Sequence, residues 1–193
     1  MLGPSPMTRT QLLELAAGLV LLGGAVGSAA YWGRAAPAGR VAAFPVSRPA
    51  EPTAAWDFEL PDLTGRPVRL RDFRGRVVLL NFWATWCAPC REEMPALETL
   101  ARELGPQGLT VVGVNVKEQK REVEAFVREH GLGFPMLLDG EGRASERYQV
   151  FALPVTFVVD RRGMLVGTVL GIRDWAGADA RAYLGQLLAA PEA

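Results

Sequence analysis

The sequence predicts a mixed α/β fold in which helices cover both faces of one central β-sheet. From residue 77 onward, apolar runs typical of strands alternate with segments that have the spacing of amphipathic helices. The last two strands, at residues 155–159 and 165–170, are joined by a tight turn and followed by a closing helix. Both cysteines of the chain, Cys87 and Cys90, lie where a strand gives way to a helix.

The expected elements follow one another without an internal repeat. A small hairpin comes first, with strands around Phe58 and at residues 68–70 on either side of a turn at residues 63–67. The main sheet is expected to use strands at residues 77–82, 109–116, 134–138, 155–159 and 165–170. Helices are expected at residues 89–104, 119–130, 144–150 and 175–188. These elements place the folded domain at residues 54–193.

A membrane-directed segment is expected in residues 1–33. Residues 15–33 carry no charge and come close to the roughly 20 residues that a helix needs to cross a bilayer. We expect a retained transmembrane anchor or, because small residues at 28–30 offer a cleavage point, a signal peptide. Three arginines follow the segment within residues 34–48 and only Arg9 precedes it, so the positive-inside rule alone would slightly favour the cytoplasmic side for the domain. Residues 34–53 are rich in Ala, Pro and Arg without a regular period, and are expected to form a semi-extended linker.

The composition removes nucleic-acid binding from consideration and leaves the cysteines available for chemistry. With 21 basic and 21 acidic residues the formal net charge is zero, so no overall field would attract a nucleic acid. A domain of this length can bury a sufficient core without disulfide cross-links. The two cysteines are therefore not needed to hold the fold together.

The cysteine spacing favours thiol-disulfide exchange. Cys87 is expected to be the exposed thiol at the helix start, where unpaired backbone N–H groups and the helix dipole favour the thiolate. This makes Cys87 the candidate nucleophile, shielded by Trp86. Cys90, one turn further into the helix, could attack a mixed disulfide formed by Cys87 and so resolve it. A zinc site is disfavoured because it needs two further ligands, and His130 is the single histidine of the chain.

The motifs around the cysteines resemble those of the thioredoxin superfamily, and within it the TlpA/ResA/DsbE-like thiol-disulfide oxidoreductases. The matching segments are NFWATWCAPC at residues 81–90, REEMP at 91–95, GVNV at 113–116, FPMLLD at 134–139 and ALPVTFVVDRRG at 152–163. The resemblance covers roughly residues 54–188. It implies a thioredoxin-like fold whose central mixed sheet is flanked by helices, with an N-terminal β-hairpin and a central αβ insertion.

The resemblance also assigns residues of the site. Pro154 corresponds to a cis-proline that faces the CxxC motif, and an X-Pro bond tolerates the cis form far better than other peptide bonds. The backbone of Leu153 would then be free to pair with an extended substrate, and Trp86 is the second expected substrate-binding residue. Asn81 stands where cytosolic thioredoxins carry a buried aspartate, and an asparagine cannot act as a base.

Glu93 is the candidate replacement for that acid. It falls in phase with Leu97 and Leu100 on the helix, so its carboxyl group should lie on the core-facing side and titrate at high pH. A carboxyl group there could exchange a proton with Cys90. Members of the ResA-like group carry a glutamate at this point of the motif. The alternative is a first-turn glutamate held only by the helix dipole, as expected for Glu92.

The resemblance implies an extracytoplasmic disulfide reductase, anchored in the membrane or secreted, that needs no cofactor or metal. Its clients would be exported proteins with disulfides, such as apocytochrome c, and a membrane carrier of the DsbD/CcdA type would supply electrons. The reducing direction is favoured because Ala88 and Pro89, between the cysteines, offer no side-chain donor to a thiolate.

Two alternatives from other classes stay open. A peroxidase of the peroxiredoxin type would carry a threonine or serine three residues before its cysteine, where this chain has Ala84, with Thr85 one residue away. A copper-binding module would use a wider cysteine spacing together with a distant histidine. Outside the motif, residues 117–119 are expected to form a solvated loop, and Trp175 to be a core or edge aromatic residue.

Overall fold

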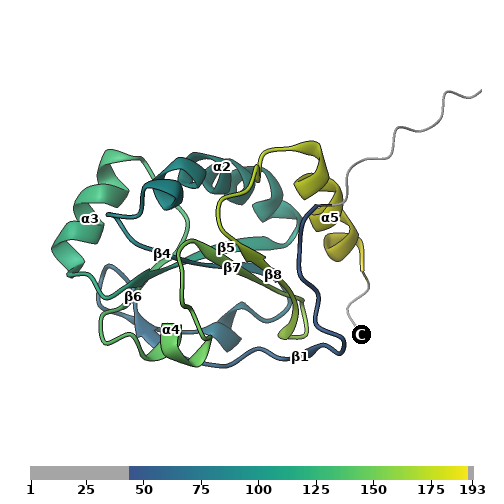
Figure 1. Ribbon diagram of the computed structural model, residues 1–193, viewed down its shortest axis with the longest axis horizontal. Helices are drawn as coiled ribbons and strands as arrows, with labels where there is room; N and C mark the ends of the chain where they lie inside the picture. Colours follow the sequence, from purple (N-terminus) through teal and green to yellow (C-terminus); the bar gives the residue numbers. More distant parts are fainter. Residues whose placement is uncertain (1–43, 191–193) are drawn as a thin grey trace, which may run out of the picture. The chain divides into compact units, whose positions relative to one another are not determined.

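A computed structural model describes residues 44–190 of the chain (Figure 1). The expected membrane segment at residues 15–33, and the linker as far as residue 43, lie outside the described residues. Within residues 44–190, no helix is long and apolar enough to cross a membrane.

Six strands form the central sheet in the order β1-β8-β7-β4-β5-β6. They are β1 (Thr53–Ala54), β8 (Met164–Leu170), β7 (Val155–Val159), β4 (Val77–Trp83), β5 (Leu109–Val116) and β6 (Met136–Asp139). The strands β4, β5 and β6 are parallel, whereas β7 runs antiparallel to β4 and β8 antiparallel to β7. The predicted mixed sheet is confirmed. This topology brings the carboxyl ends of β4 and β5 and the start of β7 to the same end of the sheet.

The expected amino-terminal hairpin is also present, as a separate two-stranded sheet of β2 (Glu59–Pro61) and β3 (Pro67–Arg69). Its turn is held by Asp62, whose Oδ1 accepts the backbone N–H groups of Thr64 at 2.7 Å and Arg66 at 3.0 Å. A short 3-10 helix, η1 (Leu70–Phe73), follows the hairpin.

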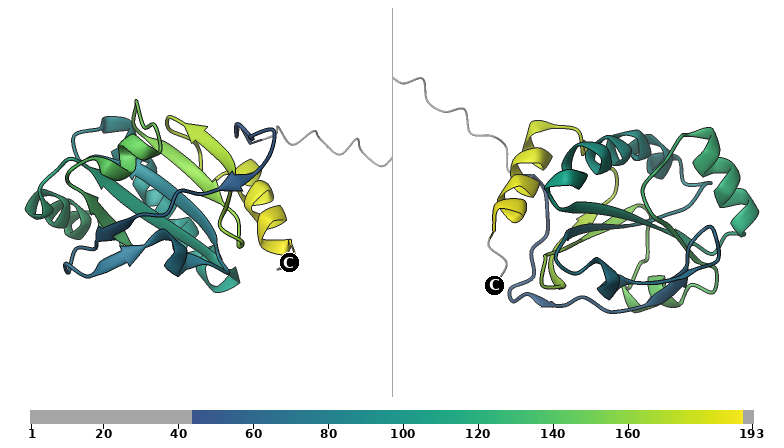
Figure 2. Two further views of the ribbon diagram at one scale, coloured as in Figure 1. Left: turned by 90° about the horizontal axis from the view of Figure 1, so that it is seen from below. Right: turned by 180° about the vertical axis from the view of Figure 1, so that it is seen from behind.

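Helices cover both faces of the sheet (Figures 1 and 2). They are α2 (Ala88–Leu104), α3 (Lys120–Glu129), α4 (Arg143–Arg147) and α5 (Ala178–Ala189), with a short η2 (Gly105–Gln107) after α2. One core cluster joins α2, α3 and α5 to one face, and a second joins α4 and the hairpin to the other. The strand β4 is buried along its whole length, which explains its continuous apolar run. An αβ pair, α3 and β6, lies between β5 and α4.

The closing helix begins later than predicted. It was expected from Trp175, but α5 starts at Ala178. Gly177 has an extended conformation, with φ −68° and ψ 162°, and caps the helix, while Asp179 in the first turn suits the positive end of the helix dipole. Trp175 belongs to the preceding loop, and its fully buried side chain packs into the core.

The folded unit extends further toward the amino terminus than the expected start at Ala54. Phe44 is buried, and its ring centroid lies 5.1 Å from that of Trp175 and 5.8 Å from that of Tyr183. Ser47 pairs with Thr168 of β8 through two backbone hydrogen bonds of 2.9 Å and 2.8 Å. Residues 44–53 were predicted to be part of the linker, but they belong to the fold. The reason is that the side chain of Phe44, which stands among Ala and Pro residues in the sequence, packs in the core.

We expect Phe44→Ala to lower the free energy of unfolding by about 3 kcal/mol, because a buried aromatic ring is lost and a cavity remains. Urea unfolding of the full chain measures this change. Phe151→Ala is the matched control, because Phe151 is 91% exposed and its ring contributes little to the core. Equal effects of the two substitutions would contradict a structural role for Phe44.

Candidate active site

Cys87 and Cys90 form a disulfide at the start of α2, with an S–S distance of 2.06 Å. Cys87 follows β4 by a short turn, in which its N–H donates to the carbonyl oxygen of Ala84 at 3.2 Å. It is the N-cap residue of α2, and its Sγ accepts the backbone N–H of Cys90 at 3.3 Å. Pro89 lies in the first turn, where its missing N–H removes no helix hydrogen bond. The strand-to-helix junction predicted for the pair is therefore present.

Cys87 is less accessible than expected. Its exposed fraction is 5%, against 0% for Cys90, so the prediction of an exposed thiol is wrong in degree, although Cys87 remains the more accessible of the two. The reason is local, because the disulfide draws Cys87 Sγ onto the first turn of α2. Trp86 is 71% exposed and therefore presents most of its indole to solvent.

The Leu153–Pro154 peptide bond is cis, as predicted. Pro154 directly precedes β7, whose first residue, Val155, pairs with Phe82 near the end of β4. This register places Pro154 at the edge of the sheet where β4 leads into the cysteine loop. The carbonyl oxygen of Pro154 accepts the N–H of Gly171 at 2.8 Å, and Leu153 is half-buried.

Glu93 lies in the core with an exposed fraction of 2%, as its phase on the helix predicts. Its Oε1 accepts a hydrogen bond from Asn81 Nδ2 at 2.8 Å, and its Oε2 accepts one from Trp175 Nε1 at 3.1 Å. Burial raises the pKa of Glu93 to about 7. The bonds from Asn81 and Trp175, together with the backbone N–H and the charge of Arg173, act in the opposite direction. The carboxyl group can therefore be either neutral or charged near neutral pH.

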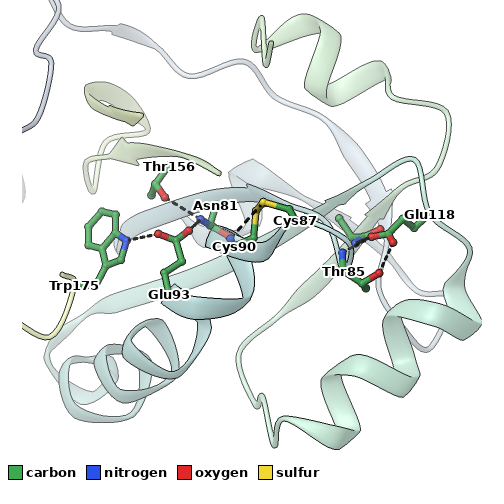
Figure 3. The surroundings of a disulfide bond; sticks show 9 residues. Asn81, Thr85, Cys87, Cys90, Glu93, Glu118, Thr156 and Trp175 are labelled. Atoms are coloured by element: carbon green, nitrogen blue, oxygen red, sulfur yellow. Dashed lines mark hydrogen bonds between the residues drawn. A yellow bond between two sulfur atoms is a disulfide. The ribbon is translucent and has the colours of Figure 1, made fainter. Parts of the chain in front are cut away.

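The carboxyl group belongs to a buried polar network that sequence reasoning missed. Asn81 Nδ2 also lies 3.0 Å from Thr156 Oγ1, and both residues are almost completely buried. In the view of Figure 3, Glu93, Asn81, Thr156 and Trp175 gather on one side of the disulfide. The network joins α2 to β4, β7 and the loop before α5. Trp175 is separated from Glu93 by 82 residues, and no local pattern pointed to their contact.

A second carboxylate lies on the other side of the disulfide in Figure 3. Glu118 accepts hydrogen bonds from the backbone N–H of Thr85 at 2.7 Å, the hydroxyl of Thr85 at 2.5 Å and Asn115 Nδ2 at 2.7 Å. The prediction of a solvated loop at residues 117–119 is therefore wrong for Glu118, which is half-buried, and holds only for its exposed neighbours. Glu118 ties the end of β5 to the loop that carries Cys87.

The single histidine lies in an ordinary helix-end environment. His130 Nδ1 is 3.0 Å from the carbonyl oxygen of Phe126, and its ring stacks on that residue with a centroid distance of 3.9 Å. Over residues 44–190, no three His, Cys, Asp or Glu side chains gather in a way that could hold a metal ion.

Comparison with known proteins identifies the family. A model described as the AhpC/TSA family matches residues 52–167, which is more than half of the chain. The chain belongs to the AhpC/TSA family. Within this family, the thiol-disulfide oxidoreductase ResA of Geobacillus thermodenitrificans is 43% identical over 119 residues, which cover 62% of this chain and 68% of the relative. The ResA of Bacillus subtilis is 38% identical over 121 residues, covering 63% and 68%.

Solved structures of similar proteins have the same fold. A thiol:disulfide interchange protein of the thioredoxin family from Chlorobium tepidum has a TM-score of 0.64 and 30% identity, and covers 72% of this chain and 99% of its own. A secreted Mycobacterium tuberculosis disulfide oxidoreductase, described as homologous to E. coli DsbE, has a TM-score of 0.59 and 25% identity, covering 66% and 95%. These relatives confirm the resemblance and the thioredoxin-like fold, and the chain is a thiol-disulfide oxidoreductase.

The raised pKa of Glu93 has a consequence for stability. The pKa of the carboxyl group is about 7 in the folded protein, against 4.5 for a glutamate fully exposed to water. Between these pH values the folded state holds a proton that the unfolded state has lost, so stability must fall as pH rises through this window. At about 1.4 kcal/mol for each pKa unit, this group removes about 3 kcal/mol by pH 8 relative to pH 4.

We therefore expect Glu93→Gln in the oxidised protein to abolish this part of the pH dependence. Urea unfolding at a series of pH values from 4 to 8 measures it. Glu92→Gln, on the exposed face of the same helix, is the matched control and should leave the slope unchanged. A Glu93→Gln variant with the slope of the unsubstituted protein would show that the carboxyl group titrates normally.

Proposed function

We propose that the protein is a disulfide reductase that works outside the cytoplasm, held at the membrane by residues 15–33 or released after cleavage of that segment. The observation that carries the proposal is the Cys87–Cys90 pair at the start of α2, one helical turn from the buried carboxyl group of Glu93. The similarity to ResA proteins and to a secreted disulfide oxidoreductase supports it. The clients would be exported proteins with disulfides, among them apocytochrome c.

The reaction begins with the reduced pair. The Cys87 thiolate attacks one sulfur of a client disulfide, so a mixed disulfide forms and the other client sulfur leaves as a thiolate that takes up a proton. Cys90 loses its proton and attacks the sulfur of Cys87, which releases the second client thiolate and closes the Cys87–Cys90 disulfide. Two electrons pass from the enzyme to the client. A membrane dithiol carrier of the DsbD/CcdA type would return two electrons to the pair.

The surroundings suit both thiols. Cys87 at the N-cap of α2 faces backbone N–H groups and the positive end of the helix dipole, which favour its thiolate. Cys90 and Glu93 are three residues apart and therefore face the same side of the helix. Because the pKa of Glu93 is about 7, the carboxyl group can accept a proton from Cys90 and pass it on near neutral pH.

Client binding would use the surface around the disulfide, at the end of the sheet where β4 ends and β7 begins. The exposed indole of Trp86 provides an apolar contact next to Cys87. Leu153, before the cis bond to Pro154, lies where its backbone could pair with an extended client segment. The backbone contact at Leu153 would not depend on the client's side chains, as expected for a reductase with several exported substrates.

A peroxidase is a weaker alternative, although the AhpC/TSA description covers the matched family. The residue three positions before Cys87 is Ala84, which is buried and has no hydroxyl group. The hydroxyl of Thr85 is engaged by Glu118 and so is not directed at a peroxide beside Cys87. The environment therefore favours disulfide exchange over peroxide reduction.

The proposed roles of the cysteines predict which variant is trapped on a client. We expect the reduced Cys90→Ser chain, mixed with insulin as a model disulfide substrate, to accumulate a covalent adduct that dithiothreitol cleaves, because Cys87 attacks and nothing resolves the product. The matched Cys87→Ser variant should form no adduct. Non-reducing electrophoresis followed by mass spectrometry measures both. Adduct formation by Cys87→Ser alone would reverse the two roles.

A further inference from the structure

The carboxyl group of Glu93 is held from outside its own helix by an indole. Trp175 lies in the loop between β8 and α5, is fully buried, and donates Nε1–H to Glu93 Oε2 at 3.1 Å. The indole nitrogen is a hydrogen-bond donor only. It can therefore donate to an oxygen of the Glu93 carboxyl group whether that group is charged or neutral. It is stronger when the oxygen is charged, and therefore favours the ionised form of Glu93.

The indole is itself held by the amino-terminal part of the fold. The ring of Phe44 lies 5.1 Å from that of Trp175, at an angle of 52°, and also stacks on Tyr183 of α5. Two backbone hydrogen bonds between Ser47 and Thr168 fasten the same segment to β8. Contacts thus run without interruption from Phe44 through Trp175 to Glu93. Neither aromatic contact follows from the CxxC motif.

We propose that Trp175 is a positioning residue for Glu93, and that Phe44 holds the indole in place, so that the amino-terminal segment helps to set the proton chemistry at Cys90. This inference rests on the proposed role of Glu93 in proton transfer. It assigns a function to the segment expected to be a passive linker.

The other groups that face Glu93 keep their own donors and charges when only the indole is substituted. Asn81 from β4 donates to Oε1, and Thr156 from β7 is a neutral hydroxyl bonded to that amide. Arg173, from the same loop as Trp175, contributes its backbone N–H and its positive charge. On α2 itself, the cysteines are the neighbouring titratable groups once they are reduced. Loss of the indole N–H alone therefore removes one donor that favours the carboxylate.

The test compares two single substitutions in the full chain. Trp175→Phe keeps an aromatic ring against Phe44 but removes the N–H donor. Trp83→Phe is the matched control, because Trp83 is equally buried but its indole N–H has no hydrogen-bond partner among the described residues. Phe44→Leu is a third variant that leaves the indole N–H intact and loosens its support.

Two quantities are measured as a function of pH. The first is the titration of the Glu93 carboxyl carbon in the oxidised protein, followed by NMR with carbon-13-labelled glutamate and assigned by its loss in Glu93→Gln. The second is the rate at which the reduced protein reduces insulin. We expect both midpoints in Trp175→Phe to move upward by about one pH unit, since a hydrogen bond to a charged group is lost. A smaller upward shift is expected for Phe44→Leu and none for Trp83→Phe.

The outcomes separate this inference from the proposed function. An unchanged carboxyl midpoint in Trp175→Phe, or an equal shift in Trp83→Phe, overturns the positioning role and leaves disulfide reduction unaffected. A shifted carboxyl midpoint with an unshifted rate profile shows that Glu93 does not control the rate, and the inference falls together with that part of the proposed function. If Trp175→Phe does not fold, Phe44→Leu decides, because an unshifted midpoint there also overturns the inference.

Discussion

The burial of one carboxyl group, that of Glu93, is the constraint on which the arrangement of the site depends. An ionised carboxylate without partners is costly in an apolar core, so the group must be hydrogen-bonded or protonated. Here both occur in part, because Asn81 and Trp175 donate to its two oxygens while burial still raises its pKa to about 7. The fold supplies these donors from β4 and from the loop before α5.

Two glutamates near the same disulfide have different environments, and we assign them different roles. Glu93 is buried, and its pKa of about 7 lies close to neutral pH. Glu118 is half-buried and surrounded by donors, namely the N–H and hydroxyl of Thr85 and the amide of Asn115. Three hydrogen bonds to this one carboxyl group fix the loop before Cys87. In the proposed mechanism only Glu93 exchanges a proton with the cysteine pair, so environment, and not residue type, distinguishes the two carboxyl groups.

Much of this arrangement could be predicted from local patterns. The alternation of strands and helices, the position of Cys87 at a helix start and the phase of Glu93 on α2 all follow from spacing along short segments. The contacts that could not be predicted join residues far apart in sequence. Trp175 and Glu93 are 82 residues apart, and Thr85 and Glu118 are 33 apart, so only the packed sheet brings them together. The burial of Phe44 could not be predicted because the residues around it have the Ala- and Pro-rich composition of a linker. One aromatic residue does not change that composition enough to indicate a core position.

The central claim is that the cysteine pair donates electrons to its clients, and its reduction potential tests this most directly. The full chain would be equilibrated against glutathione or dithiothreitol buffers of known redox potential. The oxidised fraction of the Cys87–Cys90 pair would be measured at each potential. A reductase should have a potential near or below the value of about −270 mV that thioredoxin shows, and a pair this reducing needs continuous electron supply from a membrane carrier. A potential near the value of about −120 mV of a strong periplasmic oxidant would contradict the account and make the protein a disulfide donor.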